Sequence, residues 1–288
     1  MTGVIDIGSN SVRLLISDSG RTIYKNLIIT KLSENMFKDN LLKDGAIKRT
    51  IDAILEFKRV ANSFKVESLV AFATAAVRNS HNGLLFCQEV KEKTGVDVEV
   101  VSGEKEAKLG LFGVLGSSDD GGIIDIGGAS TEITVRKGKE VVYSKSVYVG
   151  TVATLNNAGQ DLNKINKFVD EKILEFGNVE NSNFFAIGGT ATQMAAIDLK
   201  LEVYDRTKVH LYKLTKNSLE KIISLLSSKT PEERKDIKGV QIGREDVILG
   251  GAVILYKIMS KLNIDYVTIS ENDNLEGYLK VKENEKEN

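Results

Sequence analysis

A short motif near the start of the chain reappears 119 residues later, from Ile5 to Ile124, in almost the same order. Residues 5–11 read Ile-Asp-Ile-Gly-Ser-Asn-Ser, and residues 124–131 read Ile-Asp-Ile-Gly-Gly-Ala-Ser-Thr. Each copy ends an apolar strand, turns on a glycine followed by hydroxyl side chains, and leads into a second apolar strand, which is the pattern of a β-hairpin. This period is far longer than that of a solenoid repeat, so we expect two similar α/β domains that each open with the hairpin.

The rest of the chain alternates strand and helix patterns, which predicts mixed sheets with crossover connections. We place the first domain at residues 1–117 and the second at residues 118–288. Strands are expected at residues 3–8, 12–18, 21–32, 68–74, 97–101, 122–127, 131–136, 139–149, 184–187 and 265–270. Helices are expected at residues 43–64, 82–93, 103–115, 163–176, 189–198, 216–228 and 245–262. The charged run at residues 280–288 is expected to be solvated.

Composition and charge exclude several classes of protein. Lys and Arg number 39 against 40 Asp and Glu, so no overall field favours nucleic acid or a lipid surface. The longest uncharged stretch, residues 181–197, is short and contains polar side chains, so it does not predict a membrane-spanning helix. No signal-peptide pattern follows Met1, and we expect a cytoplasmic protein. One Cys and two His cannot form a zinc site, so any bound metal needs oxygen ligands.

The two hairpin turns indicate the chemistry of the site. If they face each other across a cleft, their backbone N–H groups and hydroxyls form concave arrays that bind phosphate. Asp6 and Asp125 then converge, and at about 4 Å their repulsion is about 4 kcal/mol for an effective dielectric of about 20. A bound cation or a raised pKa must compensate, and Mg²⁺ suits oxygen donors beside a phosphate. For a single copy, the alternative is a hairpin whose Asp bonds its own turn.

A wider set of motifs resembles the exopolyphosphatase and guanosine pentaphosphate phosphatase family. The matching segments are residues 5–14 (IDIGSNSVRL), 73–78 (ATAAVR), 102–107 (SGEKEA), 125–132 (DIGGASTE) and 188–190 (GGT). They occur in the family's order and span about residues 3–280. The resemblance implies an α/β fold with duplicated ribonuclease H-like domains, as in the actin, sugar-kinase and heat-shock-protein superfamily, each with a mixed sheet, and an interdomain cleft. The chain resembles the short, two-domain form.

The resemblance also implies which residues act. The family's proposed general base corresponds to Glu106, which would deprotonate a water attacking the terminal phosphorus. Glu104 lies two residues away on another helix face, where it stabilises the helix start. Arg78 is expected to be catalytic by gripping phosphate oxygens, with a surface ion pair as the alternative. The expected metal ligands are Asp6, Asp125 and Glu132. The expected phosphate-binding residues are Gly8, Ser9, Asn10, Ser11, Arg13, Gly127, Gly128, Ser130, Thr131, Gly189 and Thr190.

Three segments qualify this picture. Lys105 stands where the family often has a second acidic residue, so we expect a cation beside Glu106 that lowers its pKa or strengthens the grip on substrate. Residues 270–277 lack the Gly and Arg of the family's late motif, which puts any binding role of that Arg in doubt. Residues 204–210 resemble a family segment lining the second domain, and their basic groups either face a long anionic substrate or have no functional role.

The predicted function is exopolyphosphatase activity, in which Mg²⁺-assisted water attack removes the terminal phosphate of inorganic polyphosphate. The alternative within the family is hydrolysis of guanosine pentaphosphate. A phosphotransferase, in which Glu106 activates an acceptor hydroxyl, and a non-catalytic phosphate or nucleotide sensor are the competing classes. The expected partners are one of these polyanions and a second copy of the chain in a homodimer, with neither nucleic acid nor a membrane.

Overall fold

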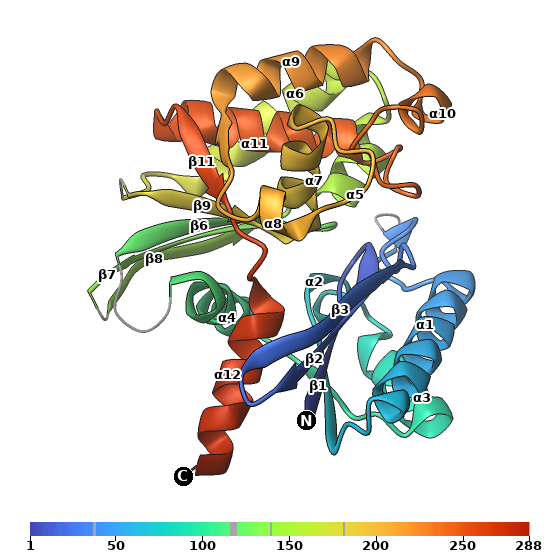
Figure 1. Cartoon of the computed structure of the whole chain (residues 1–288). Coiled ribbons are helices and arrows are strands. Elements are labelled where there is room, and N and C mark those ends of the chain that lie inside the picture. Colours follow the sequence, from blue (N-terminus) through green and yellow to red (C-terminus); the bar gives the residue numbers. More distant parts are fainter. Residues whose placement is uncertain (37–38, 116–119, 139, 181, 288) are drawn as a thin grey trace. The chain divides into compact units, whose positions relative to one another are not determined.

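The chain forms two compact units in a computed structural model, which describes residues 1–36, 39–115, 120–138, 140–180 and 182–287 (Figure 1). The first unit comprises Met1–Gly113 and Asn274–Asn288, and the second comprises Val114–Asp273. The expected boundary between residues 117 and 118 falls outside the described residues. The expected placement of residues 274–288 in the second domain is corrected, because this segment belongs to the first unit.

The first unit is built on a five-stranded sheet in the order β3-β2-β1-β4-β5. Its first three strands form an antiparallel ladder, and β4 and β5 continue the sheet in parallel to β1. The strands are β1 (Thr2–Ile7), β2 (Ser11–Asp18), β3 (Arg21–Ile29), β4 (Ser68–Ala73) and β5 (Val98–Val100). The helices are α1 (Asp44–Ser63), α2 (Ala75–Arg78), α3 (Gly83–Thr94), α4 (Gly103–Leu115) and α12 (Asn274–Glu287).

Helices cover both faces of this sheet, as the alternation of its side chains requires. On one face, Ile5 and Leu14 pack in a cluster with Phe57 of α1 and Phe86 of α3. On the other face, Val4, Leu15 and Phe72 pack in a second cluster. The helical members of that second cluster are Leu109 of α4 and Leu275, Tyr278 and Leu279 of α12. The last helix of the chain therefore completes the core of the first unit.

The second unit repeats this topology on a six-stranded sheet in the order β10-β11-β9-β6-β7-β8. The strands β6, β7 and β8 are antiparallel, and β9 and β11 run parallel to β6. The strands are β6 (Gly121–Ile126), β7 (Thr131–Lys137), β8 (Glu140–Val147), β9 (Phe184–Ile187), β10 (Lys213–Thr215) and β11 (Tyr266–Ile269). The helices are α5 (Thr151–Ala158), α6 (Leu162–Ile173), the 3-10 turn η2 (Leu174–Phe176), α7 (Gly188–Asp198), α8 (Arg206–Val209), α9 (Lys216–Ser227), α10 (Pro231–Arg234) and α11 (Ile248–Leu262).

The duplicated α/β fold with a mixed sheet in each half is thus confirmed, and each expected strand and helix has a counterpart in the structure. The expected elements do not include helices α2, α5, α8, α10 and α12 or strand β10. In particular, residues 280–287, expected to be a solvated tail, continue α12. Among the described residues, no helix combines the length and the apolar character needed to cross a membrane.

Helix α12 approaches α4 so closely that only a glycine fits at the crossing. A Cβ atom on Gly277 would lie 1.9 Å from the carbonyl oxygen of Leu109. Tyr278 stacks on Phe72 with 4.6 Å between the ring centroids, which fixes the helix over the sheet. Lys25 of β3 also pairs with Glu276 at 2.8 Å. Backbone contact, ring stacking and an ion pair together hold α12 in the first unit.

Replacement of Gly277 by Ala should therefore loosen this crossing. The added methyl group meets a backbone atom that cannot rotate away, so we expect Gly277→Ala to lower the free energy of unfolding by about 1–3 kcal/mol. Urea denaturation measures this change. Gly45→Ala in α1 is the matched control, because its Cβ would be in ordinary contact at 3.6 Å, and it should be neutral or stabilising by up to about 1 kcal/mol. Equal stability of the two variants would show that α12 does not pack tightly on α4.

Candidate active site

The two predicted hairpin turns are closed by the same backbone hydrogen bond. In the first unit Gly8 N donates to Ser11 O at 3.0 Å, and in the second Gly127 N donates to Ser130 O at 3.0 Å. The motif repeat thus reflects a repeated turn geometry. The two turns lie in different units, and the expectation that they meet at one pocket stays a prediction.

Each turn is also held from outside by backbone N–H groups of a later segment. In the first unit, Asn10 O accepts from Thr30 N and Lys31 N. In the second, Gly127 O accepts from Thr151 N and Gly128 O accepts from Val152 N, both at the start of α5. The carbonyl oxygens of Asn10, Gly127 and Gly128, which would repel a phosphate, are therefore bonded to these later segments.

The Asn10 side chain is the polar group of the first turn that most clearly lacks a protein partner. It is only 7% exposed, and neither its amide nitrogen nor its amide oxygen is hydrogen-bonded within the described part of the chain. A buried amide without partners is costly unless a ligand or water satisfies it. The expected role of Asn10 in phosphate binding is compatible with this environment.

The aspartates of the two hairpins face opposite kinds of charge. Asp6 lies directly across the β1–β2 ladder from Arg13, and its Oδ2 accepts a hydrogen bond from Arg13 Nε at 2.9 Å. At the equivalent position in the second unit, Asp125 lies directly across the β6–β7 ladder from Glu132. The same register therefore places an ion pair in one unit and two carboxylates in the other.

This difference separates the predicted metal ligands. Asp125 and Glu132 occupy opposed positions of one ladder, whose side chains lie on the same face of the sheet. They offer the paired oxygen donors that a divalent cation needs. The carboxylate of Asp6 is neutralised by Arg13, so its role as a metal ligand, and that of Arg13 in phosphate binding, stay predictions. Within the described residues, no group of three or more His, Cys, Asp or Glu side chains has the arrangement of a metal site.

Hydroxyl groups around the second turn have partners in the protein. Ser130 Oγ donates to Glu132 Oε1 at 2.7 Å, and Ser146 Oγ donates to the same oxygen. The Thr131 hydroxyl donates to Val149 O, and that of Thr190 donates to Ile126 O at 3.0 Å. These hydroxyls orient Glu132 and brace the turn, and their predicted contacts with phosphate are untested.

Helix α7 begins directly after β9, beside the second hairpin, and two glycines at its start allow close contacts there. Gly188 has a φ of +78°, and a Cβ atom on it would lie 2.9 Å from Asp125 Oδ1. A Cβ atom on Gly189 would lie within 2.7 Å of three guanidinium atoms of Arg244. Arg244 is 6% exposed and is a functional candidate that the sequence analysis missed. The only signal for it was its place in the loop before α11.

Glu106 and Arg78, the two predicted catalytic residues, are in contact within the first unit. Arg78 Nη1 donates to Glu106 Oε2 at 2.8 Å and to Val101 O at 3.0 Å. Glu106 is 7% exposed and is the first buried residue of α4. Since both bonds of Arg78 use Nη1, its Nε and Nη2 donors are without partners among the described residues. The pair can orient a carboxylate base and present a cation at the same place.

The two neighbours of Glu106 point elsewhere. Glu104 is exposed and pairs with Lys108, whose hydrogen bond lowers the pKa of Glu104. Lys105 pairs with Glu99 instead of facing Glu106. Burial raises the pKa of Glu99, but hydrogen bonds from Lys105 and Tyr278 outweigh it and hold that pKa below its ordinary value. The Lys105 ammonium, which we expected to act on Glu106, is therefore paired with the Glu99 carboxylate.

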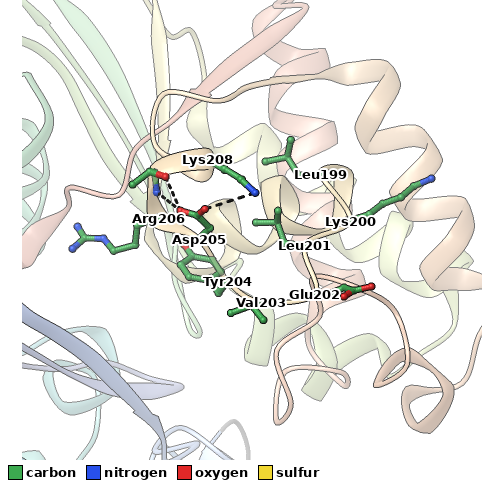
Figure 2. A pocket seen from close by; sticks show the side chains of 10 residues that line it. Leu199, Lys200, Leu201, Glu202, Val203, Tyr204, Asp205, Arg206 and Lys208 are labelled. Carbon is green, nitrogen blue, oxygen red and sulfur yellow. Dashed lines mark hydrogen bonds and ion pairs between the residues drawn. The ribbon is translucent and has the colours of Figure 1, made fainter.

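The segment from Leu199 to Lys208 lines a cavity of about 690 Å³ in the second unit (Figure 2). Asp205 caps α8 by accepting hydrogen bonds from Thr207. Arg206 pairs with Glu271 at 3.0 Å, and Tyr204 donates to the same carboxylate. Burial and the Glu271 carboxylate raise the pKa of Tyr204 far above its ordinary value. Arg206 is thus neutralised locally, and contact of this segment with a substrate stays a prediction.

Comparisons with known proteins agree on one family. The sequence model of the Ppx/GppA phosphatase family matches residues 16–285. A bifunctional 3-dehydroquinate synthase/phosphatase of Fusobacterium nucleatum is 34% identical over 95% of this chain, which spans only 45% of that protein's length. Exopolyphosphatase 2 of Mycobacterium tuberculosis is 27% identical over 95% of both chains. The crystal structure of the Aquifex aeolicus member of the Ppx/GppA family has a TM-score of 0.79 at 30% identity, over 100% of this chain and 98% of that one.

The opposed carboxylates predict a stability effect that does not depend on activity. Glu132→Gln keeps an acceptor for the Ser130 and Ser146 hydroxyls but removes one of two like charges, so the free energy of unfolding should rise by about 0.2–1 kcal/mol. Urea denaturation in buffer with a chelator tests this. Glu171→Gln, on the exposed side of α6, is the control and should be neutral. A loss of stability confined to Glu132→Gln would show that its charge is compensated in the folded protein.

Proposed function

The chain belongs to the Ppx/GppA phosphatase family, and on this basis we propose that it releases the terminal phosphate of inorganic polyphosphate by hydrolysis. Two relatives of similar length support the proposal: the mycobacterial protein is named an exopolyphosphatase, and the Aquifex protein, which has a similar fold, is a member of the same family. The observation in this structure that carries the proposal is the ion pair at 2.8 Å between the buried Glu106 carboxylate and the partly buried Arg78 guanidinium.

Glu106 acts as the general base in this proposal. Its carboxylate accepts a proton from water while the water oxygen forms a bond to the terminal phosphorus, and the bond from that phosphorus to the bridging oxygen breaks. The products are orthophosphate and a chain shorter by one phosphate. Such proton transfer contributes about 10²- to 10⁴-fold in rate. The hydrogen bond from Arg78 to Oε2 orients the carboxylate for this step.

Arg78 has a second role in the same step. Phosphoryl transfer requires little covalent chemistry from the protein and depends mainly on positioning and charge stabilisation. Because Nη1 is held by Glu106 and Val101, the guanidinium plane is fixed while its other donors can bind phosphate oxygens bidentately. The same cation thus orients the base and offsets negative charge on the substrate.

The turn that begins at Gly8 is proposed to bind phosphate through its backbone and the Asn10 amide. The carbonyl oxygens of Ser9 and Asn10 already accept hydrogen bonds from Ser33 and from Thr30 and Lys31. An anion at this turn would therefore meet donors rather than these carbonyls. The Asn10 amide, buried without partners among the described residues, gives such a ligand a hydrogen-bond partner.

Mg²⁺ is the proposed cofactor, and Asp125 and Glu132 are the residues that fit it best. Their side chains lie opposite each other and offer only oxygen donors, which suits a hard divalent cation. The cation would offset the repulsion between the two carboxylates. When bound, the ion would supply charge stabilisation to phosphate oxygens. The hydroxyls of Ser130 and Ser146 keep the Glu132 carboxylate in place for this purpose.

Replacement of the proposed base gives the decisive test of the reaction. Glu106→Gln retains the shape and the acceptor for Arg78 but cannot take a proton, so kcat should fall by at least about 10²-fold. Orthophosphate release is measured with long-chain polyphosphate and, separately, with guanosine pentaphosphate. Glu104→Gln, an exposed residue of the same helical turn, should keep the wild-type rate.

The outcomes of this experiment separate the competing functions. Unchanged turnover in Glu106→Gln would remove this residue from its role. Release from guanosine pentaphosphate alone would identify the alternative substrate of the family. ATP consumption that requires an acceptor hydroxyl would indicate a phosphotransferase, and binding of either polyanion without turnover would indicate a sensor.

The metal dependence has its own test. Asp125→Asn removes one carboxylate of the opposed pair, so the Mg²⁺ concentration for half-maximal phosphate release should rise by at least about tenfold. Asp236→Asn, an exposed residue of the same unit, is the control. The same Mg²⁺ requirement in both variants and the wild type would exclude Asp125 as a ligand.

A further inference from the structure

We propose that Tyr278 of the C-terminal helix is a positioning residue for the reaction: through Glu99 and Lys105 it holds the first turn of α4 and thereby the Glu106 carboxylate. This inference rests on the proposed function for its catalytic consequence. Its structural part, that a side chain from the end of the sequence orders the turn carrying Glu106, stands on contacts within the first unit.

The first step is the anchoring of Tyr278 itself. Its side chain is 2% exposed, and its ring lies on that of Phe72 with an interplanar angle of 20°. Its hydroxyl donates to Glu99 Oε2 at 2.7 Å. The ring is thus fixed by the core of the sheet, and the hydroxyl has a defined position beside Glu99 of β5.

The second step leads from Glu99 to α4. The other oxygen of this carboxylate, Oε1, accepts a hydrogen bond from Lys105 Nζ. The Lys105 ammonium also lies 5.8 Å from the centre of the Tyr278 ring, within the range of a cation–π contact. Lys105 is therefore held between a carboxylate and an aromatic face, both oriented by Tyr278.

The third step connects Lys105 to the proposed base. Lys105 N donates to Ser102 Oγ at 3.1 Å, and the next amide, Glu106 N, donates to Ser102 O at 2.9 Å. These bonds form the first turn of α4. The Glu106 carboxylate leaves this turn towards Arg78, so a shift of the turn changes the distance between base and substrate.

The hydroxyl of Tyr278 is the part that matters for geometry. The Lys105 and Glu99 side chains are 35% and 37% exposed, and an ion pair with that exposure contributes little to stability by itself. A buried hydroxyl that bonds the far oxygen reduces the freedom of the carboxylate and of the lysine that follows it. Displacement of a reacting group by about 1 Å can cost about 10²-fold in rate, so this restraint has a catalytic consequence.

A purely structural role of Tyr278 can be separated from a positioning role. Tyr278→Phe keeps the ring on Phe72 and removes only the hydroxyl. Its matched control is Lys280→Ala, because Lys280 lies on the same helix and donates to Phe112 O in the later part of α4, away from Glu106. Each variant loses one hydrogen bond donated by α12: Tyr278→Phe loses the bond to Glu99 of β5, and Lys280→Ala loses the bond to Phe112 of α4. We expect only the first of these losses to affect the first turn of α4.

The experiment measures kcat, KM and amide hydrogen exchange for both variants. For Tyr278→Phe we expect kcat for orthophosphate release to fall by about 5- to 100-fold with KM unchanged, and exchange of the Glu106 amide to become at least about threefold faster. Lys280→Ala should match the wild type in both. In Glu99→Gln, Tyr278→Phe should cause a smaller further loss than in the wild type, because both act through one carboxylate.

Three results would overturn the inference: wild-type kcat in Tyr278→Phe, an equal loss in Lys280→Ala, or effects of Tyr278→Phe and Glu99→Gln that simply add. If the wild type released no phosphate from any substrate, the proposed function would fail instead, and the exchange rates would still decide whether Tyr278 holds the turn.

Discussion

The glycine amide that closes each hairpin turn is the constraint on which both halves of this protein depend. The bond from Gly8 to Ser11, and its counterpart from Gly127 to Ser130, sets the register of the ladder that follows. That register places each aspartate opposite a defined residue of the next strand. The carbonyl oxygens of the turns accept hydrogen bonds from backbone N–H groups of later segments. A slip of one residue would move every side chain of the ladder to the other face.

The duplicated frame carries different charges in its two halves. Asp6 faces a guanidinium, whereas Asp125 faces the Glu132 carboxylate in the same register. Like charges in opposed positions cost stability, and proteins commonly accept such a cost where a ligand is to be bound. This difference is why the second hairpin is the one proposed to bind a cation, and the first hairpin the one proposed to bind phosphate.

The first unit is not continuous in sequence, because α12 supplies part of its core. Leu275, Tyr278 and Leu279 follow the i, i+3, i+4 spacing of a buried helix face and pack with Leu109 of α4. Gly277 permits the close crossing. The helix that carries Glu106 therefore acquires its full set of contacts only when the end of the chain is in place, which ties the geometry of the proposed base to distant residues.

Sequence alone determined the duplicated α/β fold and the order of its main strands and helices, because these follow from local periodicity and from motifs within a few residues. The spacing also put Glu104 and Glu106 on different faces of α4, and the structure exposes the first and buries the second. The helical signal at residues 274–279 was present but obscured by the charged run after it. Only the tertiary structure decided that Asp6 pairs with Arg13, that Lys105 turns to Glu99, that Arg244 lies against Gly189, and that α12 belongs to the first unit. Each of these is a contact set by strand register or helix crossing, and such contacts depend on how distant segments pack rather than on the order of neighbouring residues.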